Sequence, residues 1–156
     1  MSAIRTNRAR KSGFTLIEIL IVVIILGILA AIVIPQFSSA SNDARRSNVQ
    51  TTAQTLRSQI ALFRLQHADK LPDAANFWNL MTQYSSEDAA TLSTAKTATT
   101  KYGPYMQQVA PNALNQLTTI ADGTSGSNVG YVYDYATGNG SGQIWGTDTD
   151  KTTLVK

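Results

Sequence analysis

Residues 8–37, RARKSGFTLIEILIVVIILGILAAIVIPQF, divide the chain into two parts of different character. Within this stretch residues 14–34 are almost wholly apolar, whereas the chain after Gln36 is mostly polar with scattered hydrophobic side chains. A helix of about 20 apolar residues covers the hydrocarbon thickness of a bilayer. The sequence therefore predicts one membrane-spanning helix followed by a polar domain.

Four basic side chains precede the apolar run and none follows it immediately: Arg5, Arg8, Arg10 and Lys11. Because positive charge stays on the cytoplasmic side, we expect the N-terminus to be cytoplasmic and residues 35–156 to be exported. A secretory signal peptide is the alternative, with a shorter apolar core and a cleavage site after small residues. Here the core is longer, and Ala30-Ala31 is a poor cleavage site. We therefore favour a retained anchor.

The rest of the composition excludes several classes of protein. Beyond the four N-terminal cations, nine basic side chains face ten acidic ones, so the sequence lacks the basic surface that nucleic-acid binding requires. There is no cysteine, and therefore no disulfide framework or thiol nucleophile. His67 is the only histidine, and no nucleophile-elbow sequence accompanies it. We expect His67 to lie at a helix end near the last carbonyls, and we expect no enzymatic activity.

One acid, Glu18, interrupts the apolar run close to its start. A charged side chain in a membrane span costs roughly 2.5–3.5 kcal/mol on insertion scales. Glu18 either reaches the polar headgroups, or is protonated, or has a partner of opposite charge. The residues that precede it distinguish between these alternatives.

The segment KSGFTLIE, residues 11–18, resembles the leader junction of the type IV pilin and pseudopilin superfamily. The family pattern is a short basic leader that ends in glycine, then phenylalanine, then a hydrophobic helix with glutamate as its fifth residue. Gly13, Phe14 and Glu18 supply this pattern in register. The resemblance implies that a prepilin peptidase removes residues 1–13 by cleaving between Gly13 and Phe14, and methylates the new amine of Phe14.

The resemblance also implies a role for Glu18 in filament assembly. Stacked subunits bury the N-terminal amine among apolar helices, where a charge is tolerated only if it is paired. We expect Glu18 of a neighbouring subunit to be that partner and to set the register of an incoming subunit. Gly27 and Pro35 fall where pilins commonly have residues that weaken the helix, so residues 27–35 are expected to loosen or extend on assembly.

Beyond Pro35 the sequence predicts that the helix continues to about His67, a length of about 80 Å from Phe14. Apolar residues recur there at spacings of four and three, which predicts one stripe packed on a globular domain: Val49, Ala53, Leu56, Ile60 and Phe63. Arg45 and Arg46 precede this stripe and are expected either to face solvent or to contact acidic neighbours in a filament. The helix is expected to end within residues 66–73, where Pro72 and Asp73 break it.

The remaining segments predict a small sheet. Residues 74–85 are typical of a short helix, and residues 85–101, rich in Ser, Thr and Ala, of a surface loop or weak helix. Tyrosines alternate with other residues over 131–135, and Gly-rich turn residues separate them from a second strand at 143–145. This pattern predicts a β-hairpin. The expected fold is α+β: a long N-terminal helix, membrane-spanning over 14–34, packed on a small antiparallel sheet within a head of residues 35–156.

Within the superfamily, the head resembles the major pseudopilins of type II secretion systems, through GPYMQQVAPNALN at 103–115 and GYVYDYATG at 130–138. Many major pseudopilins bind calcium through a C-terminal loop, which implies Asp148 and Asp150 as ligands here. This sequence departs from the pattern because its tail is short and has no EF-hand loop. No cofactor is certain, and calcium is the one candidate.

The resulting hypothesis is a major pseudopilin that polymerises into a helical filament and pushes folded cargo out of the periplasm. The implied partners are copies of itself, the prepilin peptidase and methyltransferase, minor pseudopilins and an inner-membrane assembly platform. We expect a single-pass inner-membrane protein with a periplasmic head. A true type IV pilin for adhesion, twitching motility or DNA uptake is the first alternative. A membrane-anchored binding module that never polymerises is the second.

Overall fold

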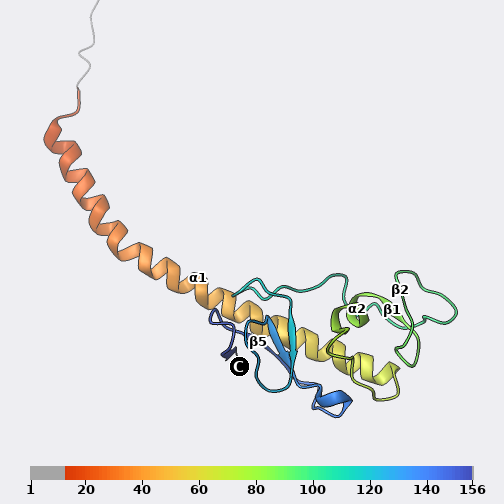
Figure 1. Cartoon of the computed structure of the whole chain (residues 1–156). Coiled ribbons are helices and arrows are strands. Elements are labelled where there is room, and N and C mark those ends of the chain that lie inside the picture. The colour runs from red at the N-terminus through yellow and green to blue at the C-terminus, as the bar shows by residue number, and fades with distance from the viewer. Residues whose placement is uncertain (1–12, 156) are drawn as a thin grey trace, which may run out of the picture. The chain divides into compact units, whose positions relative to one another are not determined.

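The computed structural model describes residues 13–155, which belong to two compact units that divide between Ala40 and Ser41. Helix α1, Leu16–Gln66, begins in the first unit and ends in the second (Figure 1). Its bounds lie within two residues of the predicted Phe14 and His67, so the long helix is confirmed. The predicted basic leader before Gly13 lies outside the described residues.

The second part of α1 is fixed to the head by one stripe of buried side chains. The five buried residues are those that the periodicity predicted: Val49, Ala53, Leu56, Ile60 and Phe63. Leu56, Ile60 and Phe63 share a core with Tyr131, Tyr133 and Ile144 of the sheet, and β5 lies beside this part of α1 (Figure 1). Burying each large apolar side chain contributes about 1.5–3 kcal/mol.

Helix α1 ends at Gln66, before the prolyl break that the sequence predicted at Pro72. Ala68 and Asp69 adopt positive φ values of 51° and 64°. The backbone N–H of Asp69 donates to the carbonyl of Arg64 at 2.9 Å. A left-handed turn of this kind satisfies the last carbonyls of a helix, so the chain reverses before the proline is reached.

The segment after this turn forms a small lobe near the end of α1 (Figure 1). Helix α2, Phe77–Thr82, confirms the predicted short helix and buries Phe77, Leu80 and Met81. Strand β1, Tyr84–Ser85, pairs antiparallel with β2, Leu92–Ser93. Residues 85–101 therefore contain a small hairpin and loops, and no helix forms in this described segment.

A four-stranded sheet of order β3-β4-β5-β6 forms the other side of the core. Its strands are β3, Ile120–Asp122; β4, Tyr131–Tyr133; β5, Ile144–Thr147; and β6, Leu154–Val155. The predicted hairpin is confirmed by β4 and β5, which pair antiparallel with Val132 opposite Trp145. A one-turn 3-10 helix, η1, Ala136–Gly138, lies between these two strands.

The sheet is mixed rather than wholly antiparallel, because β3 and β4 run parallel. A parallel partner requires the chain to travel back along the length of the first strand. Because each strand has only three residues, the segment 123–130 is long enough to return the chain to the start of β4. The predicted α+β class is confirmed. The alternation of tyrosines indicated that only one face of β4 would be buried. Val132, on the other face, is buried as well, because the backbone at Gly126 lies against it.

Asn112 joins three separate parts of the head. Its buried side-chain Nδ2 donates to the carbonyls of Gly130 at 2.7 Å and Thr147 at 2.8 Å. Its Oδ1 accepts from the backbone N–H of Leu114 at 2.8 Å. The loop before β3 is thereby fixed to β4 and β5.

Replacing Asn112 by Ala is expected to lower the free energy of unfolding by about 3 kcal/mol, because it leaves buried backbone groups without partners. Urea unfolding of the detergent-solubilised chain, followed by circular dichroism, measures this change. Asn79→Ala, at an exposed position of α2, is the matched control and should change little. Equal midpoints for the two variants would contradict the assigned role.

Two core tyrosines differ from a third in how their hydroxyls are satisfied. The hydroxyls of Tyr131 and Tyr133 are buried without a hydrogen-bond partner among the described residues, and burial raises the pKa of Tyr131 to about 12. The hydroxyl of Tyr105 donates to Oε1 of Gln66 at 2.7 Å. The hydroxyls of Tyr131 and Tyr133 therefore carry an uncompensated desolvation cost. The hydrogen bond of Tyr105 offsets the cost of burying its own hydroxyl.

Tyr131→Phe is expected to raise the free energy of unfolding by about 1 kcal/mol, whereas Tyr105→Phe should lower it by about 1 kcal/mol. The paired comparison uses the same urea unfolding measurement. Loss of stability in Tyr131→Phe would mean that its hydroxyl has a partner in solution, such as a buried water.

Candidate functional site

The predicted cleavage junction lies immediately before α1. Gly13, Phe14 and Thr15 are not helical, and the Phe14 side chain is 83% exposed. A peptidase binds its substrate backbone in an extended form, and a helix would have to unwind first. The non-helical segment therefore leaves the bond between Gly13 and Phe14 open to such an enzyme.

Glu18 is bound to the residue that begins its own helix. Its Oε2 accepts from the backbone N–H of Thr15 at 2.7 Å and from the Thr15 hydroxyl at 2.8 Å. In return, the backbone N–H of Glu18 donates to the Thr15 hydroxyl at 3.3 Å. This reciprocal pair is a capping box, which satisfies N–H groups that have no partner inside the helix.

The sequence contains the signature of a capping box, Thr-x-x-Glu before an apolar run. The pilin pattern concerns only Glu18 and therefore did not predict its contact with Thr15. The carboxylate of Glu18 thus has hydrogen-bond partners within its own chain. Pairing with Phe14 of another subunit stays a prediction.

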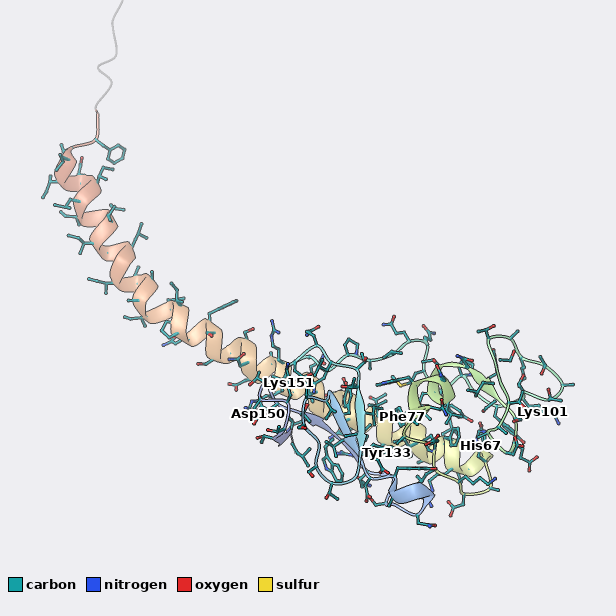
Figure 2. The ribbon with its side chains drawn as sticks, viewed as in Figure 1. His67, Phe77, Lys101, Tyr133, Asp150 and Lys151 are labelled. Carbon is teal, nitrogen blue, oxygen red and sulfur yellow. The ribbon has the colours of Figure 1, made fainter. Side chains whose placement is uncertain are left out.

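The first part of α1 carries apolar side chains on all sides, and none of them is buried in the described structure (Figure 2). Within residues 13–155, α1 is the one helix long and apolar enough to cross a membrane. Such a surface is stable in lipid or against other apolar helices and not in water.

Gly27 and Pro35 both lie inside α1. Proline has no N–H to donate to the preceding turn, and the hydroxyl of Ser39 donates to the Pro35 carbonyl at 3.2 Å. A Cβ added at Gly27 would meet nothing within 4 Å, so no contact within the described chain requires glycine there. Loosening of residues 27–35 on assembly stays a prediction.

Asp148 and Asp150 lie in the loop between β5 and β6, which Figure 2 shows beside α1. Asp148 forms an ion pair with Arg46, so Arg46 has a partner within its own chain. Residues 13–155 contain no group of three or more His, Cys, Asp or Glu side chains that could hold a metal ion. Calcium binding by the two aspartates stays a prediction that these contacts do not favour.

His67 lies just past the helix end, as predicted, but it is fully buried. Its Nδ1 lies 2.9 Å from the carbonyl of Phe63, and its Nε2 lies 2.9 Å from the Ser85 hydroxyl. Since a carbonyl only accepts, Nδ1 carries the hydrogen in this contact. The ring also stacks on Phe63 with centroids 3.8 Å apart. His67 therefore joins α1 to β1 as a core residue.

Comparison with known proteins agrees with this geometry. Residues 8–34 match the family model of the prokaryotic N-terminal methylation motif. The chain is 46% identical over 57 residues to the type IV narrow pilus major component PilA5 of Thermus thermophilus, covering 36% of this chain and 49% of the relative. It is 39% identical over 61 residues to the type II secretion system core protein G of Pseudomonas aeruginosa, covering 39% of this chain and 43% of the relative.

A third relative, the type IV major pilin protein PilA of Myxococcus xanthus, is 42% identical over 67 residues, covering 43% of this chain and 30% of the relative. The chain thus matches less than half the length of these curated relatives. No solved structure is significantly similar to it.

The exposed apolar helix, the methylation motif and the α+β head support a pilin-like structural subunit rather than an enzyme. Over the segments that they match, the methylation motif and these relatives support the type IV pilin and pseudopilin superfamily.

Proposed function

We propose that the chain is the major pseudopilin of a type II secretion system, whose polymerisation pushes folded cargo out of the periplasm. The similarity to core protein G, 39% and 34% identical over 61 and 62 residues of two relatives, supports this function. The observation that carries the filament role is the all-round apolar surface of the first part of α1, residues 16–34, in which Glu18 is the single carboxylate. This surface has no partner within the described chain, and stacked copies of the helix would bury it.

Processing by a prepilin peptidase and methyltransferase would begin the mature chain at Phe14. The new amine carries a positive charge at the helix start, and burial in a filament requires a negative partner. Glu18 of a neighbouring subunit supplies that charge without leaving an uncompensated ion. Apolar burial then gives most of the cohesion, and the ion pair sets the register.

The proposed topology has the leader in the cytoplasm, α1 in the inner membrane over residues 14–34 and the head in the periplasm. Arg5, Arg8, Arg10 and Lys11 support this orientation through the positive-inside rule. The proposed partners besides other copies of the chain are minor pseudopilins and an inner-membrane assembly platform.

A true type IV pilin is the second candidate, and the 46% identity to a narrow pilus component favours it. The family model matches only residues 8–34, where both kinds of subunit carry the same junction, so this match does not separate the two candidates. The relatives of both kinds match less than half of this chain.

Deleting the gene and comparing the culture medium with that of the parent strain tests the proposal. Loss of specific enzymes from the medium, with their accumulation in the periplasm, is the result expected for a secretion pseudopilin. Unchanged secretion, with loss of surface filaments, twitching or DNA uptake, would instead identify a pilin.

A further inference from the structure

The loop between β5 and β6 does not have the donor arrangement that calcium requires. Calcium takes six to eight oxygen ligands that converge at about 2.3–2.6 Å. In this loop the Oδ1 of Asp150 accepts from the backbone N–H groups of Thr152 at 2.9 Å and Thr153 at 2.8 Å. Its Oδ2 accepts from the Thr153 hydroxyl. Both carboxylate oxygens of Asp150 are thus used inside the loop.

The other aspartate is equally occupied. Oδ1 of Asp148 accepts from the backbone N–H of Thr149 at 2.6 Å, and Oδ2 is paired with the Arg46 guanidinium. The Asp148 side chain is only 13% exposed. A carboxylate so far withdrawn from water needs a positive partner, and an arginine from α1 supplies it.

An apolar contact accompanies this ion pair on the same stretch of α1. Val49 lies three residues after Arg46, which places both on one face of the helix. Val49 packs with Leu114 and with Val155 of β6. The polypeptide that leaves β5 is thus attached to α1 twice, through a charge at Asp148 and through a buried side chain at Val155.

The backbone of the loop is closed by its own hydrogen bonds. The N–H of Asp148 donates to the carbonyl of Thr153 at 2.8 Å, and the N–H of Lys151 donates to the carbonyl of Asp148 at 2.9 Å. Asn115 adds a side-chain bond from its Nδ2 to the Asp148 carbonyl at 3.2 Å. Lys151 adopts a positive φ of 61° at the tip of the turn. No step of this closure requires a metal ligand.

We propose that Arg46 is the built-in cation of this loop, joining Asp148 to α1 so that the head closes independently of calcium. The guanidinium supplies the positive charge that a bound ion would supply, and it belongs to the helix that the loop must reach. This role concerns the head alone and does not depend on the kind of filament that the subunit forms.

The test uses the purified full-length chain in detergent, with thermal unfolding and limited trypsin digestion as readouts. Melting curves in calcium chloride and in a calcium chelator are expected to coincide for the natural sequence. Arg46→Gln should lower the melting temperature by about 3–6 °C in both buffers and speed cleavage after Lys151. The matched control is Arg45→Gln, whose Nη1 donates to the Ala113 carbonyl at 3.4 Å rather than to a carboxylate.

A double-mutant cycle separates the ion pair from general damage to α1. The double variant Arg46→Gln with Asp148→Asn removes both charges. Its melting temperature should fall by less than the sum of the falls for the two single variants. A rise in melting temperature on adding calcium to the natural chain would overturn the proposal. Equal behaviour of Arg46→Gln and Arg45→Gln, or strict additivity in the cycle, would do so as well.

Discussion

Filaments should be absent when Glu18 is replaced by Ala, while the subunit still inserts in the membrane at its normal level. Leaving one member of a buried ion pair alone costs about 3–5 kcal/mol, and the loss recurs at every subunit contact. Insertion depends on the apolar length of α1, which the change does not shorten. Sedimentation of filaments released from lysed cells, beside membrane fractionation of the same cells, measures both quantities.

Two further variants separate the charge of Glu18 from its other contacts. Glu18→Gln keeps an oxygen that can accept from Thr15 as in the capping box, but it lacks the charge, so it should also fail to assemble. Ile19→Ala removes apolar area from the neighbouring position and should still assemble. Normal filaments with Glu18→Ala would contradict the pairing. Absence of filaments from the natural chain as well would favour an anchored module that does not polymerise.

Gly13→Val is expected to leave the leader attached, with cleavage slower by about 100-fold because a branched side chain displaces the scissile bond in a narrow subsite. A Cβ added at Gly13 meets nothing within 4 Å in the described structure. The chain itself should therefore accept the substitution, and the loss should occur in the complex with the peptidase. Mass spectrometry of the membrane-extracted subunit distinguishes the full chain from one that begins at Phe14.

Gly27→Ala is the matched control for this experiment, since a Cβ there also meets nothing within 4 Å. It should be processed normally. Efficient cleavage of Gly13→Val before Phe14 would refute the leader assignment, and with it the proposed origin of the N-terminal amine.

Features that depend on neighbouring residues were predictable from the sequence. The one helix long and apolar enough to cross a membrane, among the described residues, follows from the apolar run after Glu18. The buried stripe from Val49 to Phe63 follows from helical periodicity. The hairpin of β4 and β5 follows from alternation around a Gly-rich turn. Each pattern reports a local backbone geometry.

Other features arose only when distant segments met. The helix α1 ends at Gln66, within the predicted range, but the left-handed turn at Ala68 and Asp69 ends it before Pro72 is reached. Val132 is buried because residues 123–130, which return the chain from β3, cover the second face of β4. His67 became a core residue because β1 brings Ser85 to its ring. The periodicity of a single segment cannot predict these contacts, because each of them joins segments that are distant in the sequence.

The sequence by itself determined the long helix, the register of its buried stripe and the α+β class, whereas the junction at Gly13 and Phe14 and the membrane span over 14–34 stay predictions. Only the tertiary structure decided how the charges of the head are paired. Arg46 and Asp148 are 102 residues apart in the chain, and an ion pair leaves no periodic signal at either position. Local patterns follow from backbone geometry, whereas pairs such as this one follow from the packing of the whole head.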